Sequence, residues 1–263
     1  MAKYIEVVNN NSVVSVDDTQ ARLSLKRSVP LNSIGYDKSH GYSWDIMHGC
    51  DQYCIKTLYR FPIQLATNEK MFSIRALADN PHTGFSRLAN GDSASYLYAY
   101  QNRYNTIGFD NYVIDFYGYD TVKTGSFGLQ VFDANGNIIF NSNKYYFDVS
   151  GQYNVQHTDG TAYEFANQPS VFPRRIDIGS YSRKNSAVVL NVGAYNACKF
   201  VSNYDTPYDL VYTIVFGNTL YLEPRIAYWE QSWSTWSTVS NHNGFPNFAR
   251  LSSGIILDTT NIS

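Results

Sequence analysis

The sequence has little charge and no long apolar run. Only 16% of its 263 residues are charged and the formal net charge is −2, which argues against a nucleic-acid-binding surface spread over the chain. No apolar run approaches the roughly 18 residues that a membrane span needs. The opening segment MAKYIEVVNN lacks the apolar core of a signal peptide. We therefore expect neither nucleic-acid binding nor membrane insertion.

Cysteines are equally scarce. Cys50, Cys54 and Cys198 cannot all pair within the chain, so a secreted disulfide framework is not expected, and assembly in a reducing cytoplasm fits better. The stretch HGCDQYC (48–54) has the look of a metal knuckle, but no second Cys or His pair follows at zinc spacing. We interpret these thiols, and His48, as small buried or half-buried side chains, and we expect no metal and no cofactor.

Catalytic motifs are missing as well. The chain has no Gly-x-Ser-x-Gly nucleophile elbow, phosphate loop or dinucleotide fingerprint, and its five His follow no recognisable pattern. We therefore predict that the protein is not an enzyme. Paired carboxylates for glycoside hydrolysis stay open, because such partners meet only in the fold. The candidates by expected exposure are Asp45, Glu164, Asp177 and Glu230.

Aromatic residues and short alternating segments are what the chain does have. It contains 23 Tyr and 15 Phe, and aromatic residues favour strands. Clusters of Gly, Asn, Asp and Ser cut the sequence into short segments, as all-β sandwiches require. We predict an all-β fold of β-sandwich modules with little helix. Its clearest strands are expected at 71–78, 111–120, 187–195, 209–217 and 219–229.

The segment GLQVFDANGNIIFNS (128–142) predicts a β-hairpin. Asn135-Gly136 suits a two-residue type I′ turn, which needs positive φ at both central residues. That turn would place Val131 opposite Phe140, Phe132 opposite Ile139 and Gln130 opposite Asn141. Apolar pairs then lie on both faces. Such a strand pair belongs inside a sandwich or between packed subunits.

The start of the chain carries a fainter copy of this hairpin. YIEVVNNNSVVSVDD (4–18) aligns without gaps on 128–142, and Leu23 and Leu25 fall on Phe147 and Val149. One offset of 124 residues carries the whole match. It suggests two equivalent β modules, 1–124 and 125–263, in which 4–25 and 128–149 superpose as hairpin-plus-strand units. A chance likeness between hairpins is the alternative.

The same residues carry a resemblance. GLQVFDANGNIIFNS, with YVIDFYGYD (112–120) before it, resembles a pattern in small proteins encoded among the tail genes of tailed bacteriophages. In that pattern, a strand ending in Tyr or Phe precedes Gly-Leu-x-Val-aromatic-Asp/Asn-Ala-x-Gly-x-Ile/Val-Phe-Asp/Asn-Ser. The opening KYIEVVNNNSVVSVDD is similar to the start of such virion proteins. The likeness covers about 3–28 and 111–150. It implies a virion component of the tail, tail tip or a fibre.

Three of the four Trp residues lie within eight residues of one another. Ser and Thr separate them and favour a loop over a helix. These rings either fill the core or a subunit contact, or form an exposed platform for a host glycan or receptor. The candidate binding residues are Tyr228, Trp229, Trp233, Trp236, Asn241 and His242, with Asn243 beside them.

Three functions compete on these observations. The first is a structural virion protein, assembled in the host cytoplasm as a homo-oligomer with other tail proteins as partners, and a trimer if it is fibre-like. The second is a receptor- or carbohydrate-binding module of a phage tail that serves host attachment. A polysaccharide-degrading enzyme is third, because the long repeats of a β-helix are missing.

Overall fold

The all-β fold predicted from the sequence is confirmed by a computed structural model, in which the strands pair antiparallel. Only two short 3₁₀ helices accompany the strands in the part of the chain that the structure describes. The described residues are 4–8, 13–17, 22–40, 55–77, 83–87, 96–102, 108–120, 128–133, 135–156, 176–179, 186–192, 195–199, 207–217, 219–227 and 251–262.

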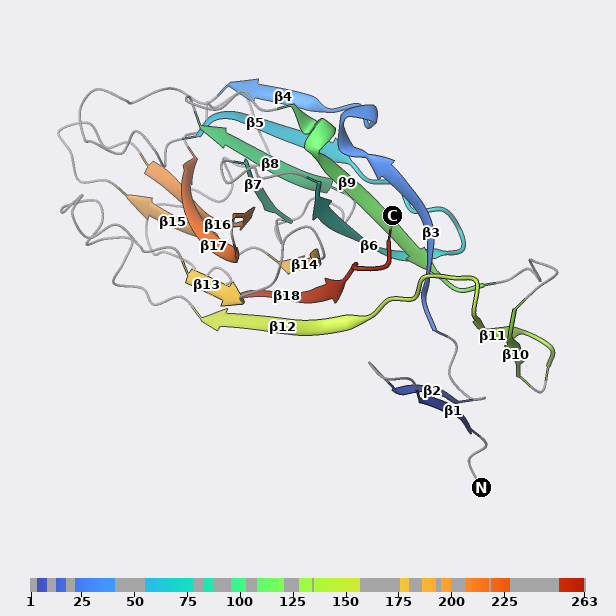
Figure 1. The fold of residues 1–263 in the computed structure, drawn as a ribbon. Coiled ribbons are helices and arrows are strands. Elements are labelled where there is room, and N and C mark those ends of the chain that lie inside the picture. Colours follow the sequence, from blue (N-terminus) through green and yellow to red (C-terminus); the bar gives the residue numbers. More distant parts are fainter. Residues whose placement is uncertain are drawn as a thin grey trace.

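Figure 1 shows the described strands in chain order, from β1 near the N-terminus to β18 near the C-terminus. The elements are β1 (Tyr4–Val8), β2 (Val13–Asp17), β3 (Ser24–Pro30), η1 (Leu31–Ser33), β4 (Asp37–His40), β5 (Ile55–Pro62), β6 (Glu69–Ala76), β7 (Thr83–Ser86), β8 (Tyr96–Asn102), η2 (Phe109–Asn111), β9 (Tyr112–Gly118), β10 (Gln130–Phe132), β11 (Ile138–Asn141), β12 (Val149–Gln156), β13 (Ile176–Gly179), β14 (Ser186–Val192), β15 (Tyr195–Lys199), β16 (Pro207–Phe216), β17 (Leu220–Ala227) and β18 (Leu251–Asp258).

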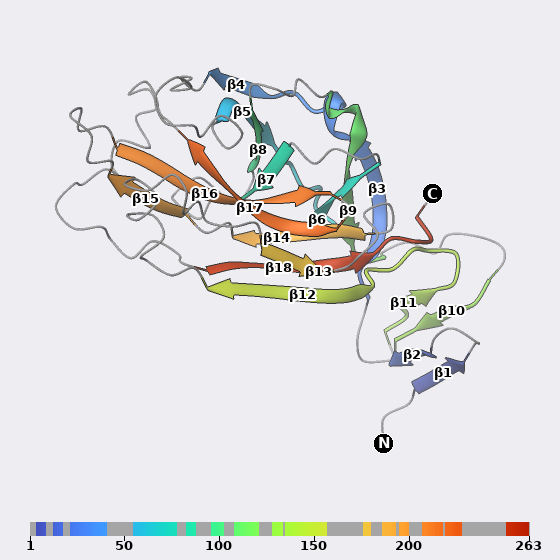
Figure 2. The ribbon, with the colours of Figure 1, turned by 60° about the vertical axis from the view of Figure 1, so that its left-hand side comes forward.

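Two large sheets form the body of the molecule. One has six strands in the order β12-β18-β14-β6-β9-β3, and the other has the order β13-β17-β16-β7-β8-β5-β4, with β15 paired to β16. Two further sheets are the separate hairpins β1–β2 and β10–β11. Both hairpins lie at the end of the molecule where β3 begins, outside the two large sheets (Figures 1 and 2).

The core lies between the two large sheets. Alternate residues of β9 point into it, and the ring of Tyr112 meets that of Phe85, from β7, at a centroid distance of 4.7 Å. Such edge-to-face contacts are the favoured geometry for aromatic pairs. Aromatic residues contribute much of this core, whose largest fully buried side chains include Tyr112, Phe61, Phe85, Phe116 and Phe216.

The outer face of the six-stranded sheet carries a second apolar cluster. Tyr117 of β9 packs there with Ala187, Val189 and Leu257. The segment that leads into β12 reaches the same cluster through Phe147. Every residue of β9 is buried as a result, so both sets of alternating side chains in this strand face apolar surroundings or buried partners.

The three strands at one edge of the six-stranded sheet have the same relative chain order as the three strands at the other edge. The N-terminal trio runs β3-β9-β6 from one edge, and the C-terminal trio runs β12-β18-β14 from the other. The two trios join through β6 and β14, where Arg75 lies opposite Ala187 and Ile74 opposite Val188. Each half of the chain therefore contributes three strands in the same relative order.

The edge strands of the two trios share a bulge. In β3 the register shifts between Leu25 and Arg27, and in β12 it shifts between Val149 and Gly151. Each pair of corresponding positions is 124 residues apart, which is the offset of the sequence repeat. Bulges are specific features of a strand, so their coincidence supports the equivalence of β3 and β12.

The start of β3, with Leu23 before it, also pairs with the segment before β12. An antiparallel bridge joins Ser24 to Tyr146, and the Phe147 N–H donates to the Leu23 carbonyl at 2.9 Å. Leu23 thus lies opposite Phe147, the residue 124 positions later. An approximate two-fold axis between the trios would produce this register, because the residue at such an axis lies opposite its own equivalent.

The predicted modules 1–124 and 125–263 share both large sheets and one core cluster. The boundary between the two modules stays a prediction that is based on the sequence repeat. The two hairpins occupy corresponding places before β3 and β12, but their registers differ by two residues. Ile5 lies opposite Val16 in the first hairpin, whereas Val131, and not Leu129, lies opposite Phe140 in the second.

The hairpin expected at 128–142 is present, but two details of its prediction were wrong. Gln130 does lie opposite Asn141, as predicted, whereas Phe132 lies opposite Ile138 because the register shifts after Val131. Positive φ is found at Gly136 (82°) and at no described non-glycine residue, Asn135 included. The connection is therefore not a type I′ turn. The hairpin also stands outside the sandwich, which leaves the contact between subunits as its remaining predicted setting.

Candidate functional site

The residues proposed from sequence for binding lie outside the described residues. This holds for Tyr228, Trp229, Trp233, Trp236, Asn241, His242 and Asn243. Among the four candidate carboxylates, Asp177 is described and lies exposed on the edge strand β13. Asp45, Glu164 and Glu230, together with His48, Cys50 and Cys54, fall outside the described ranges, and Cys198 lies in β15.

The hairpin β10–β11 is the best-defined projecting feature, and Asp133 shapes its connection. The Asp133 carboxylate accepts hydrogen bonds from the N–H groups of Asn135 and Asn137, each at 2.8 Å, and from the Asn137 side-chain amide. The Asn137 bonds are the main cause of the lowered pKa of Asp133. A side chain that bonds the backbone two residues on forms an Asx turn. Gly136 then closes the loop by donating to the Asp133 carbonyl at 3.1 Å.

We expect Gly136→Val to open this hairpin without unfolding the sandwich. A β-branched residue at φ 82° costs about 1–2 kcal/mol, although a Cβ there would meet no atom within 4 Å. The matched control is Gly136→Asn, because Asn tolerates positive φ. Hydrogen exchange at the Gly136 or Asn137 amide should rise in the Val variant and much less in the Asn variant. Equal exchange in both variants would contradict this account of the turn.

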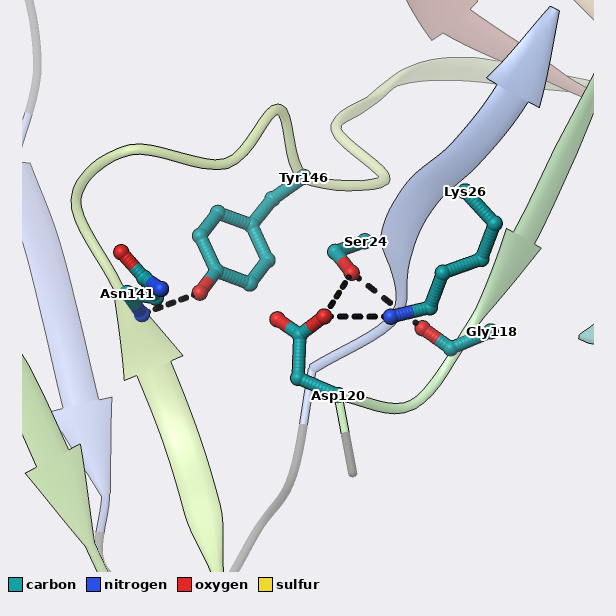
Figure 3. Close-up of polar contacts among 6 residues, drawn as sticks. All are labelled: Ser24, Lys26, Gly118, Asp120, Asn141 and Tyr146. Atoms are coloured by element: carbon teal, nitrogen blue, oxygen red, sulfur yellow. Dashed lines mark hydrogen bonds and ion pairs between the residues drawn. The ribbon is translucent and has the colours of Figure 1, made fainter. Parts of the chain in front are cut away.

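A polar junction joins the start of β3 to the end of β9 (Figure 3). Ser24 donates to the Asp120 carboxylate at 2.9 Å, and Lys26 forms an ion pair with the same oxygen. The Ser24 hydroxyl also lies 3.4 Å from the Gly118 carbonyl. The side chains of Lys26 and Asp120 are 14% and 8% exposed. Screening by solvent is weak at such exposure, so this ion pair holds the end of β9 against the start of β3.

Tyr146 connects the junction to the hairpin. Its hydroxyl accepts a hydrogen bond from the Asn141 N–H, and its ring stacks on Phe140 with centroids 5.3 Å apart (Figure 3). Burial raises the pKa of the Tyr146 hydroxyl. The neighbouring carbonyl of Tyr145 accepts from the Leu25 N–H at 2.7 Å. The segment that follows the hairpin is therefore paired with β3, and Tyr146 in that segment contacts the last strand of the hairpin.

Apolar side chains stand exposed along this hairpin and the segment that follows it. Leu129 is 45% exposed, Phe132 36%, Tyr145 45% and Val149 53%. They make up half of the eight large hydrophobic residues found exposed in the described structure. Ile138 and Ile139 of the same hairpin are buried. A protein that exposes several apolar side chains in one region uses them for contact with a partner more often than scattered ones.

The N-terminal hairpin adds to this region. Its strand β2 lies against β11, and the two hairpins lie side by side in both views of the ribbon (Figures 1 and 2). We name β1–β2, β10–β11 and the exposed residues Leu129 and Phe132 the hairpin end. The chemistry that this end offers is contact through apolar side chains and strand edges.

The most deeply buried charges belong to the body of the protein. Asp115 accepts hydrogen bonds from Arg75 Nε at 2.9 Å, Arg75 Nη2 at 3.3 Å and Ser28 Oγ at 2.6 Å. These contacts tie β9 to both of its neighbours, β6 and β3. Buried charges are stable only when they are paired and hydrogen-bonded, so we interpret this group as a structural element of the sheet.

Within the described ranges, no group of three or more His, Cys, Asp and Glu residues is placed to hold a metal ion. In the same ranges, no helix has the length and apolar character to cross a membrane. Comparisons of the chain with protein-family models, curated proteins and solved structures found no match. The choice of the hairpin end as the candidate site is therefore based on its geometry alone.

The exposed residues of the hairpin end were not singled out from the sequence. The apolar pairs on both faces of 128–142 were the available signal, because a hairpin with two apolar faces outside a core must expose one of them. The sequence alone did not decide whether the hairpin lies inside the sandwich or at a contact between subunits. Only the placement of β10–β11 outside the large sheets distinguishes them.

Proposed function

We propose that this protein is a structural component of a bacteriophage virion, in the tail, the tail tip or a fibre. It is assembled in the host cytoplasm, forms a homo-oligomer, and makes contacts with neighbouring virion proteins through the hairpin end. If fibre-like, the homo-oligomer would be a trimer. The role needs no cofactor and no catalytic step. The resemblance of 3–28 and 111–150 to phage tail-associated proteins supports the proposal.

One observation carries the proposal furthest. The segment with the strongest resemblance, 128–142, forms a hairpin that projects from the sandwich and exposes Leu129 and Phe132. Tyr146, which pairs with Ser24 of β3, contacts the last strand of this hairpin through Asn141 and Phe140. Interfaces use such preorganised apolar anchors, because less conformational freedom is lost on binding.

The test is incorporation of a double variant, Leu129→Ser with Phe132→Ser, into particles that lack the native copy. Truncating anchor residues costs more than 1 kcal/mol each at many interfaces, so we expect at least about a tenfold loss of incorporation. Both side chains are exposed, and the isolated protein should keep its melting temperature. The amount in purified particles can be measured by quantitative mass spectrometry.

Leu65→Ser is the matched control for this experiment. Leu65 is 44% exposed, close to the 45% of Leu129, but it lies between β5 and β6 in the body. This variant should enter particles as the native chain does. Equal incorporation of the double variant, or a native chain absent from purified particles, would overturn the proposal.

A further inference from the structure

β12 is an edge strand that lacks the charged residues and prolines which commonly protect an edge against pairing. Its eight residues, VSGQYNVQ, contain no charge and no proline. Among the described strands it pairs with β18 alone, and it lies along the outer margin of the body in both ribbon views (Figures 1 and 2). Gln152 and Asn154 are exposed on it, whereas Tyr153 is buried. An open edge of this kind is a template for another strand.

The equivalent edge strand β3 provides an internal comparison. Its positions correspond to those of β12 by the shared bulge and the 124-residue offset. At corresponding places β3 has Lys26, Arg27 and Pro30. Lysine and proline on an edge are common devices against edge-to-edge pairing. At those places β12 has Ser150, Gly151 and Asn154. The bulge is common to both edges, whereas the charged residues and the proline are found on β3 and not on β12.

We propose that β12 pairs antiparallel with β12 of a second copy of this chain, which makes a two-fold dimer with a continuous sheet. In an antiparallel pair, residues opposite each other point to the same face. Buried Tyr153 and exposed Gln152 therefore keep their own faces in the dimer. The contact is isologous, as in most homodimers.

The distribution of charge favours β12 over β3 as the strand that pairs with a second copy. Lys26 and Arg27 of β3 are ion-paired with Asp120 and Glu69, and pairing of two β3 strands would bury these charges further, which costs desolvation. Two β12 strands bring no charges together. A second copy also has a strand whose alternation of buried and exposed residues fits that of β12. Dimerisation through β12 does not require that the protein be part of a virion.

The test compares full-length protein with the variant Gln152→Lys/Asn154→Lys in sedimentation velocity over a range of concentrations. We expect the native chain to dimerise, and the double-lysine variant to dimerise at least about tenfold more weakly, because it supplies the edge charges that block pairing. The control is Asn32→Lys/Thr67→Lys, which adds the same charge at exposed positions outside β12. It should dimerise as the native chain does.

Hydrogen exchange gives a second readout that needs no variant. Protection of amides in 149–156 should increase with protein concentration in the native chain, since pairing covers the open edge. A native chain that stays monomeric, or a trimer whose mass is unaffected by the two lysines, would overturn the proposal. Protection in 149–156 that does not change with concentration would do the same.

Discussion

Replacing Asp115 by Ala is expected to lower the free energy of unfolding by about 3–5 kcal/mol, because it leaves the Arg75 guanidinium buried and unpaired. The Asp115 side chain is fully buried and that of Arg75 is 8% exposed. The lost carboxylate also leaves the Ser28 hydroxyl without this acceptor. Urea denaturation followed by tryptophan fluorescence measures the change.

The surface pair Arg60–Asp37 is the matched control. Arg60 donates to Asp37 at 2.6 Å, as close a contact as those at Asp115, but the Asp37 side chain is 61% exposed. Exposed pairs of this kind contribute about 0.2–1 kcal/mol, so Asp37→Ala should have a small effect. If the two variants were equally destabilised, burial would not be the cause. Replacing both buried partners, with Arg75→Met and Asp115→Leu, should recover much of the loss.

Gly118→Ala is the second change with a large expected effect. Gly118 ends β9 and lies opposite Ser24 of β3 and Glu69 of β6. An added Cβ would overlap the backbone carbonyl of Asn68, and this backbone cannot move aside cheaply because it leads directly into the paired strand β6. Overpacking costs about 1–3 kcal/mol and occasionally more, and the overlap with backbone places this variant at the upper end. The midpoint of thermal unfolding should fall accordingly.

Gly35→Ala is the control for the glycine variant. No atom lies within 4 Å of a Cβ placed at Gly35, and its φ is not positive. The change should be neutral or stabilising by about 0.4–1 kcal/mol, since it reduces the freedom of the unfolded chain. A Gly118→Ala protein as stable as Gly35→Ala would show that the close approach of Asn68 to β9 is wrong.

The strands were predictable from sequence because alternation of apolar residues survives in them. The segment 111–120 contains β9, and 209–217 overlaps β16. In β9 the alternation separates two buried faces, and the polar member of the second face, Asp115, is accommodated by Arg75. A local pattern cannot reveal that partner, because Arg75 comes from another strand 40 residues away.

The turn of the hairpin was predicted less well, for a local reason. Asn135-Gly136 favours a two-residue connection when only backbone preferences are considered. The Asp133 carboxylate instead binds the N–H groups of Asn135 and Asn137, which widens the loop and shifts Phe132 opposite Ile138. Asp at this position was visible in the sequence. The hydrogen bonds by which Asp133 favours the wider loop over the two-residue turn form only once the loop has closed.

The sharing of sheets between the two halves could not be read from the repeat alone. The offset of 124 residues predicts equivalent hairpins and strands. It does not say whether equivalent strands form two separate sheets or opposite edges of one. The pairing of β6 with β14 decides this. Only the sheet order shows that β12 is an edge strand and that it can be compared with β3 at the opposite edge.

Electron cryomicroscopy of purified phage particles would show whether this protein is part of the virion and what its hairpin end contacts. We expect density for several copies of this sandwich in the tail, with Leu129 and Phe132 buried against a neighbouring protein. Particles that lack the chain, or that hold it with the hairpin end facing solvent, would contradict the proposed function.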